Sequence, residues 1–145
     1  MTTVYVLSGI PGSGKTTLAH QLAGQHNATV YSYDELPGAN TKASMDGSVK
    51  QAWLASIRED LRTGKSVICD GLNLTVTERK ELLSTFADIP CKKVLYVKIV
   101  PLETCLQRNR ERKARLPDFV VEQSAERMEP PTKDEGWDAI YLSQE

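Results

Sequence analysis

The chain has 145 residues, of which 40% are hydrophobic and 26% are charged, and its formal net charge is −1. This length and composition predict one soluble globular domain that buries a core without disulfides or a structural metal. A net charge near zero excludes a strongly cationic nucleic-acid coat and a polybasic membrane binder, but it does not exclude a local basic patch.

Short apolar runs alternate with longer segments of helical periodicity. In chain order we predict strand 4–8, helix 14–24, strand 29–32, helix 46–63, strand 66–70, helix 76–87, strand 93–100, helix 102–113, helix 119–127 and strand 139–142. In helix 46–63 an apolar stripe recurs every four residues, and Gly64 follows it as a helix cap; the stripe consists of Val49, Trp53, Ile57 and Leu61. The alternation predicts a parallel sheet with helices on both faces, so ligands should bind beyond the carboxyl ends of the strands.

The first strand leads into Gly-Ile-Pro-Gly-Ser-Gly-Lys-Thr, residues 9–16, which matches the G-x-x-x-x-G-K-[ST] phosphate loop in full. Its glycines let backbone N–H groups point at phosphate oxygens, and the following helix adds its positive dipole end. The strand–loop–helix context favours nucleoside-triphosphate binding over a chance glycine-rich turn. The nucleotide-binding residues predicted here are Gly9, Pro11, Gly12, Ser13, Gly14, Lys15, Thr16 and Thr17.

Carboxylates follow the next two strands. Asp34, just past strand 29–32, is a candidate for the base that a kinase needs, and capping the turn before Pro37 is the alternative. Asp70 closes the apolar run 67–69, as a Walker B carboxylate does, and would support Mg²⁺ together with the Thr16 hydroxyl. Capping of the next turn is its alternative. Arg79, in helix 76–87, equally fits a solvated helix surface.

A charge-dense segment lies near the carboxyl end of the chain. Within residues 108–115 there are five cations and one glutamate. Arg108 and Arg112 are four residues apart, so we expect them to share one helix face, whereas Arg110 points elsewhere. Two such arginines on a helical lid, about residues 105–117, would neutralise charge on a transferring phosphoryl group. A solvated basic helix is the alternative, which the phosphate loop makes the weaker one.

These motifs, in this order, resemble the polynucleotide 5′-kinase branch of the P-loop kinases. The resemblance rests on the phosphate loop and five further segments: 33–34, 70–73, 105–112, 116–117 and 128–137. It implies a three-layer α/β/α P-loop kinase domain over residues 1–145 that transfers the γ-phosphate of ATP, with Mg²⁺, to the 5′-hydroxyl end of a nucleic acid. It also implies that Lys15 acts at the donor phosphates, that Asp34 is the general base, and that Arg112 grips those phosphates beside Arg108.

One position departs from that pattern. The phage enzyme of this branch has an arginine three residues beyond its general base, whereas this chain has Pro37. The contact to an acceptor phosphate is therefore absent or supplied from elsewhere, for which Lys42 and Arg79 are candidates. The same machinery would also serve a hydroxymethylated base in DNA, a nucleoside, a tRNA-linked group or a small metabolite.

Other observations limit the remaining readings. A nucleotide-gated switch is disfavoured by the full set of candidate catalytic residues, and a GTPase by the lack of an N-K-x-D motif. Tyr31, Tyr33 and Trp53 are candidate stacking surfaces for a terminal base, with core packing favoured for Trp53. Three widely spaced cysteines without a C-x-x-C pair argue against disulfides and zinc. With neither an apolar run of membrane length nor a signal peptide, we expect a cytoplasmic protein that does not bind membranes.

Overall fold

The computed structural model describes residues 2–33, 47–113 and 115–144. The strands are β1 (Thr3–Ser8), β2 (Thr29–Ser32), β3 (Val67–Asp70), β4 (Lys92–Ile99) and β5 (Ala139–Gln144). The helices are α1 (Lys15–His26), α3 (Ser48–Arg62), α4 (Val76–Thr85), α5 (Leu102–Arg110), α6 (Asp118–Arg127) and the short 3-10 helix η2 (Lys133–Glu135). Every predicted strand and α-helix is present, with ends that differ by up to three residues.

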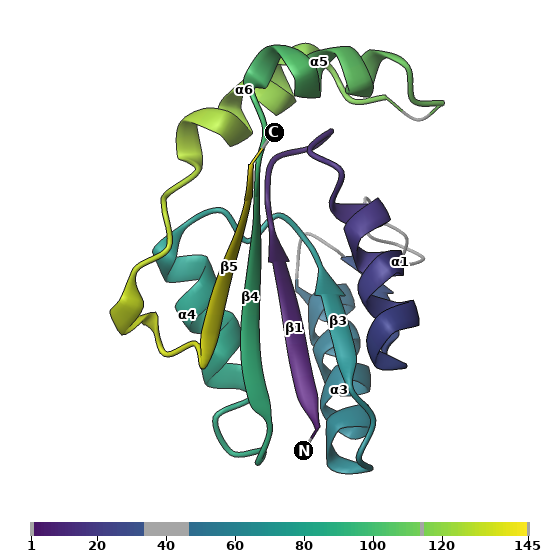
Figure 1. Ribbon diagram of the computed structural model, residues 1–145, viewed down its shortest axis with the longest axis vertical. Coiled ribbons are helices and arrows are strands. Elements are labelled where there is room, and N and C mark those ends of the chain that lie inside the picture. Colours follow the sequence, from purple (N-terminus) through teal and green to yellow (C-terminus); the bar gives the residue numbers. More distant parts are fainter. Residues whose placement is uncertain (1, 34–46, 114, 145) are drawn as a thin grey trace.

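The strands form one parallel sheet in the order β2-β3-β1-β4-β5. The first strand of the chain is therefore central, and its register pairs Leu7 with Asp70 on one side and with Tyr96 on the other. The carboxyl ends of the strands point toward α5, which crosses above them (Figure 1). The loop after β1 consequently lies between the ends of β3 and β4, where ligands of such sheets bind.

Helices cover the sheet on both faces, as predicted (Figure 1). On one face α3 and α4 bury Trp53, Ile57 and Phe86 against the inward side chains of β1, β3 and β4. On the other face α1 packs Ala19 and Leu22 against the alternate side chains of the same strands. Alternation of side chains along each strand supplies both apolar faces, and this confirms the predicted three-layer α/β/α arrangement.

Local signals set the ends of two helices. Three of the four residues of the predicted α3 stripe, Trp53, Ile57 and Leu61, are buried, whereas Val49 is half-buried. The helix ends just before Gly64, which has φ 89°. At the start of α4, Thr75 and Glu78 form a capping box, in which the Thr75 hydroxyl accepts from the Glu78 N–H at 3.1 Å. Neither helix therefore depends on packing alone to define its ends.

The three cysteines, Cys69, Cys91 and Cys105, are buried, and they form no disulfide with one another. Burial raises the pKa of the Cys69 thiol well above its usual range, so this side chain behaves as a small apolar residue of the core. In the described ranges, no cluster of three or more His, Cys, Asp or Glu side chains is arranged to hold a metal ion. No helix in those ranges has the length and apolar character needed to cross a membrane.

Candidate active site

The phosphate loop lies between β1 and α1 and adopts a conformation that requires glycine. Gly12 has φ 84° and Gly14 has φ 92°, both in the left-handed region. A Cβ atom on Gly9 would lie 2.7 Å from the Ser13 Oγ, so the loop is closed tightly around its own atoms. Its start is fixed by a hydrogen bond from the Gly9 N–H to the Leu72 carbonyl, at 3.0 Å. The helix that begins at Lys15 therefore presents its amino end at the mouth of this loop.

Thr16 and Asp70 come from different elements and meet at the carboxyl edge of the sheet. The Thr16 hydroxyl donates to Asp70 Oδ2 at 3.2 Å, and the Ser32 hydroxyl, at the end of β2, donates to the same oxygen at 3.1 Å. The Asp70 carboxylate is 7% exposed. Hydroxyl and carboxylate oxygens are ligands that Mg²⁺ prefers. The structure thus brings together the two residues predicted to support Mg²⁺, and it adds Ser32, which the sequence did not indicate.

Asp34 and Pro37 lie outside the described residues, as does Lys42. The chain is described up to Tyr33, one residue past the end of β2. The two tyrosines offered as stacking surfaces have contacts of their own. Tyr31 donates its hydroxyl to Asp60, and burial together with this bond raises its pKa to about 12. Tyr33 meets Trp53 edge to face, with ring centroids 5.5 Å apart.

Trp53 is 5% exposed and belongs to the main core cluster. Core packing, the reading favoured from the sequence, is therefore confirmed for this residue. It is not available as a surface on which a terminal base stacks.

Helix α5 is pressed onto the phosphate loop. A Cβ atom on Gly12 would overlap the Cys105 carbonyl oxygen, so only glycine lets the two backbones approach this closely. Arg108, near the end of α5, places Nη1 3.5 Å from the Gly12 carbonyl oxygen. Arg108 therefore lies beside the phosphate loop, and its contact with donor phosphates stays a prediction.

The prediction that Arg108 and Arg112 share a helix face is wrong. Helix α5 ends at Arg110, and Arg112 lies in the turn that follows, with its N–H bonded to the Asn109 carbonyl at 3.2 Å. The buried side chain of Asn109 causes this turn, because its amide bonds both backbone groups of Leu116, at 2.7 and 3.1 Å. These bonds fold the chain back toward α6.

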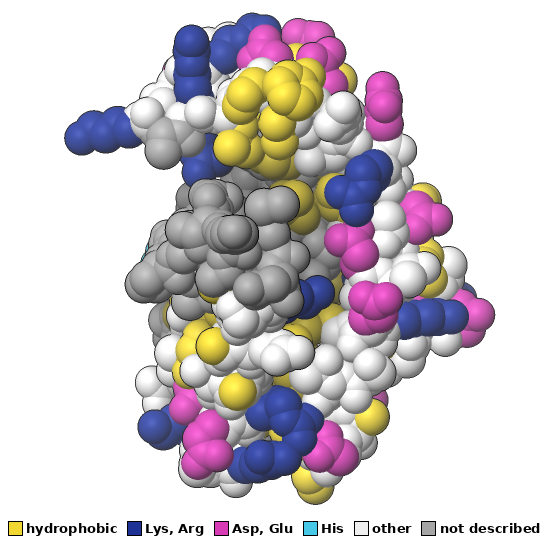
Figure 2. Space-filling view, turned by 180° about the vertical axis from the view of Figure 1, so that it is seen from behind, with side chains coloured by type: hydrophobic (Ala, Val, Ile, Leu, Met, Phe, Trp, Pro, Cys, Tyr) yellow, Lys and Arg dark blue, Asp and Glu magenta, His cyan; other side chains and the backbone are white. Residues whose placement is uncertain are grey.

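The tip between α5 and α6 is strongly basic at its surface. Arg110, Arg112, Lys113 and Arg115 are exposed. Lys and Arg side chains project there at the upper left of Figure 2, beside hydrophobic side chains that gather above the grey region. Arg110 is engaged by Asp118 in an ion pair of 2.8 Å, which leaves it a poor candidate for phosphate binding. The solvated alternative thus describes Arg110, while Arg108 faces the loop.

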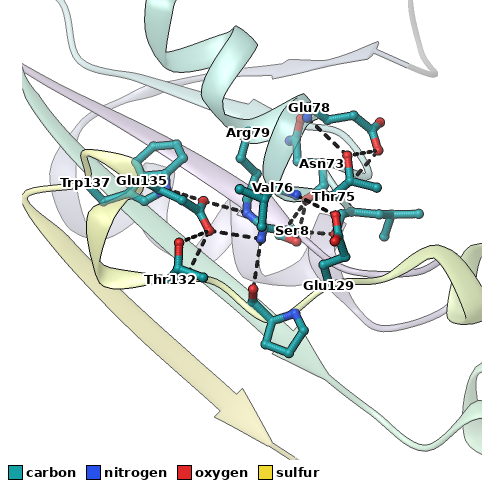
Figure 3. Close-up of polar contacts among 12 residues, drawn as sticks. Ser8, Asn73, Thr75, Val76, Glu78, Arg79, Glu129, Thr132, Glu135 and Trp137 are labelled. Carbon is teal, nitrogen blue, oxygen red and sulfur yellow. Dashed lines mark hydrogen bonds and ion pairs between the residues drawn. The ribbon is translucent and has the colours of Figure 1, made fainter.

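Arg79 is neither a solvated helix residue nor available to an acceptor phosphate, so both sequence-based suggestions for it are wrong. Its side chain is fully buried and donates from Nε and Nη2 to the two Glu135 oxygens, at 2.8 and 3.1 Å (Figure 3). Its remaining donors reach the carbonyls of Asn73, Leu74 and Pro130, at 2.9–3.2 Å. Arg79 therefore fastens the loop after β3 to the segment that precedes β5.

The loop after β3, which Arg79 holds, contacts the end of β1, directly before the phosphate loop. Asn73 has φ 46°, and its side-chain Nδ2 donates to the Leu7 carbonyl at 2.8 Å. The Ser8 hydroxyl donates to the Asn73 carbonyl at 2.7 Å (Figure 3). Asn73, which belongs to the segment 70–73 on which the family resemblance rests, thus contacts the end of β1. The sequence signals this residue but cannot signal its buried partners, which lie far along the chain.

The site is chemically suited to a nucleoside triphosphate with Mg²⁺. Three observations support this fit: the glycine cradle that a Cβ would fill, the Thr16–Asp70 oxygen pair, and the guanidinium of Arg108 at the loop. In addition, the Ser13 hydroxyl is buried within the loop with no hydrogen-bond partner in the described ranges. Together these groups provide donors and positive charge for phosphate and oxygen ligands for a divalent ion.

The chain resembles known proteins in sequence and in fold. The sequence profile of the AAA domain family matches residues 4–131. In the structure of the Pnkp1/Rnl/Hen1 RNA repair complex, the match has a TM-score of 0.77 and 19% identity over 87% of this chain and 43% of that one. A sugar kinase from Janibacter sp. HTCC2649 matches with a TM-score of 0.75 and 19% identity over 99% and 86%. Kti12 from Chaetomium thermophilum, in complex with ADP-AlF3, matches with a TM-score of 0.73 and 21% identity, over 97% of this chain and 88% of that one. At these identities the likeness establishes the fold.

Proposed function

The chain belongs to the AAA domain family, and from this membership and its site we propose that it transfers the γ-phosphate of ATP to a hydroxyl group. The observation that carries the proposal is the convergence at the end of β1. The phosphate loop, the Thr16–Asp70 pair and Arg108 meet there from separate elements. A nucleotide-binding module would need the loop and could use the oxygen pair for a metal, but it would not need a lid arginine as well.

Each residue has a proposed role. Lys15 and the backbone of residues 9–14, with Thr17, hold the donor phosphates, and Thr16 and Asp70 hold Mg²⁺. When bound, Mg²⁺ supplies neutralisation of the charge on the phosphate oxygens. The chain's own contribution is to fix the phosphates in the glycine cradle and to place cations around them, which is most of what phosphoryl transfer asks of a protein.

Asp34 is proposed as the general base. It follows β2, whose last residue, Ser32, shares the Asp70 carboxylate with Thr16. A base at this point takes the proton of the acceptor hydroxyl as the new phosphorus–oxygen bond forms and the bond to ADP breaks. Arg108 and Arg112 are proposed to stabilise the charge on the transferring group. Arg108 already lies beside the phosphate loop, whereas Arg112 would have to reach the phosphates from the turn after α5.

The favoured acceptor is the 5′-hydroxyl end of a polynucleotide. It is supported by the resemblance over residues 9–137 and by the fold shared with a component of an RNA repair complex. The exposed basic tip between α5 and α6 offers positive charge to a phosphate backbone. The fold is also shared with a sugar kinase, and phosphoryl transfer to a different hydroxyl would use the same donor site. The acceptor is therefore the element to test.

The experiment is transfer of labelled γ-phosphate with Mg²⁺ to three kinds of acceptor in parallel. These are oligonucleotides with 5′-hydroxyl ends, the same oligonucleotides with 5′-phosphate ends, and a panel of nucleosides and sugars. Label found only on 5′-hydroxyl oligonucleotides supports the proposal. Label that survives 5′ phosphorylation moves the acceptor to a base or an internal hydroxyl. Label on a panel member alone replaces the polynucleotide with that compound.

Two variants link the activity to the site. Asp34→Asn should lower turnover by several orders of magnitude while nucleotide still binds, and Lys15→Ala should abolish transfer. Near-normal turnover in Asp34→Asn would remove this residue as the base. Nucleotide binding without transfer to any acceptor, in the wild-type chain, would make the protein a nucleotide-dependent switch instead.

A further inference from the structure

We propose that Lys98 of β4 is a phosphate-binding residue of the donor nucleotide, acting on the phosphates that stay with the leaving group. The proposal rests on the proposed function, because it assumes that the phosphate loop binds ATP and releases ADP. Lys98 belongs to no motif in the sequence, and its place in the site comes from the fold alone.

The supporting observation is the position of the Lys98 side chain against the phosphate loop. The point at which a Cβ atom of Gly14 would lie is 3.6 Å from Lys98 Cε and 3.9 Å from its Nζ. The same point is 3.8 Å from Nη1 of Arg108. Two cations from different elements, a strand and the lid helix, therefore converge on the residue that precedes Lys15. Cations brought together in this way suit a polyanion between them.

The order of the strands decides which phosphates Lys98 faces. Strand β1 lies between β3 and β4, and the phosphate loop follows it. The Thr16–Asp70 pair and Ser32, at the carboxyl end of β2, lie on the β3 side of this loop. Lys98 approaches from the β4 side. A phosphate chain that crosses the loop with its reacting end toward the acceptor therefore presents its nucleoside end to Lys98.

The neighbouring strand holds Lys98 in place. Its Nζ lies 3.4 Å from the Ser143 hydroxyl of β5, its register partner across the pair β4–β5. An ammonium group has three donors and keeps its full charge when one of them bonds a hydroxyl. Ser143 thus orients the side chain without neutralising it. Lys92, at the other end of the same strand, points to the same face but is exposed and far from the loop.

This position predicts a particular kinetic signature. At the nucleoside end the α-phosphate keeps its charge during transfer, whereas the β-phosphate gains charge as its bond to the γ-phosphorus breaks. A cation on the α-phosphate therefore stabilises the bound nucleotide and the transition state about equally. Loss of Lys98 should therefore weaken ATP and ADP binding by a similar factor and leave kcat nearly unchanged. A residue that only supports the fold would instead lower thermal stability and would not discriminate between binding and turnover.

The experiment measures the dissociation constant of ADP with Mg²⁺ by titration calorimetry, for wild type, Lys98→Gln, Lys98→Arg and the control Lys92→Gln. Hydrogen bonds to charged groups predict a loss of about tenfold or more for Lys98→Gln. Lys98→Arg should recover most of the affinity, and Lys92→Gln should match wild type. Melting temperatures without nucleotide should be alike in all four proteins.

The outcomes separate this inference from the proposed function. If wild type binds ADP and Lys98→Gln binds it equally well, the role of Lys98 is refuted and the proposed function stands. If Lys98→Arg is as weak as Lys98→Gln, charge is not what the site uses, and the inference fails. If wild type binds no adenine nucleotide, the proposed function and this inference fail together.

Discussion

The buried ion pair between Arg79 and Glu135 gives a direct test of how the site is supported. Both side chains are 0% exposed, and the arginine uses all five N–H donors, two on the carboxylate and three on backbone carbonyls. Glu135→Gln removes the counter-charge and keeps the shape of the side chain. It leaves a guanidinium ion in the interior with no negative partner.

The expected loss of unfolding free energy is about 3–5 kcal/mol, the cost of leaving one member of a buried pair uncompensated. Domains of this size have a total stability of about 5–15 kcal/mol, so the change consumes a large share of it. A matched control is Asp88→Asn, which removes the negative charge of the 2.8 Å ion pair with Arg58. Because Asp88 is solvent-exposed, we expect a far smaller effect there.

Urea unfolding, followed by tryptophan fluorescence and by circular dichroism, measures both variants. Trp137 reports on the altered site directly, since its indole Nε1 donates to Glu135 at 3.0 Å (Figure 3). Arg79→Lys, which keeps a charge but loses the forked geometry, should fall between wild type and Glu135→Gln. The reasoning is refuted if Glu135→Gln costs no more than Asp88→Asn. If Glu135→Gln is too unstable to purify, Arg79→Lys provides the test, and it must then show a clear loss of unfolding free energy.

Four further predictions concern the same framework. Burial alone would raise the pKa of Glu135, but its hydrogen bonds outweigh burial and hold the pKa below its ordinary value. The difference in unfolding free energy between wild type and Glu135→Gln should therefore narrow as the pH falls below the ordinary pKa of a glutamate. A difference that stays constant with pH would contradict this. Gly12→Ala should strain the phosphate loop and push α5 away, so it should lower the melting temperature by several degrees and weaken ADP binding. Asp70→Asn should abolish the dependence of ATP affinity on Mg²⁺, measured by titration with and without the ion. Arg112→Ala should reduce kcat more than Arg110→Ala, and equal effects would remove Arg112 from the proposed machinery.

Much of the fold was predictable because each element carries its own local signal. The apolar stripe of Trp53, Ile57 and Leu61 defines the buried side of α3, and the glycines of the phosphate loop define the turn after β1. The parallel direction of the strands follows from the alternation of short apolar runs and helices, whereas their order in the sheet was not predicted. The Thr16–Asp70 contact follows in turn, because the carboxyl ends of parallel strands meet at one edge of the sheet.

The errors have one physical origin, which is side-chain pairing that the local sequence pattern does not indicate. Arg79 has the local context of a surface helix residue, and only Glu135, 56 positions later, makes its burial tolerable. Arg112 fits a helical spacing, but the Asn109 side chain ends α5 two residues earlier by bonding Leu116. The sequence places Lys98 in a strand, but it does not show that Lys98 lies near Gly14, because this depends on how the phosphate loop turns.

Pairings of this kind have a consequence for the chemistry. Phosphoryl transfer depends on groups held in position more than on unusual reactivity, so the residues that hold the loops matter as much as those that touch phosphate. Arg79 fixes the loop after β3, that loop bonds the end of β1, and the phosphate loop begins at the next residue. Weakening the Arg79–Glu135 pair should therefore reduce ATP affinity even in molecules that stay folded. Measured below the urea transition, a fall in nucleotide affinity would trace support of the site to this pair, and an unchanged affinity would confine the pair to global stability.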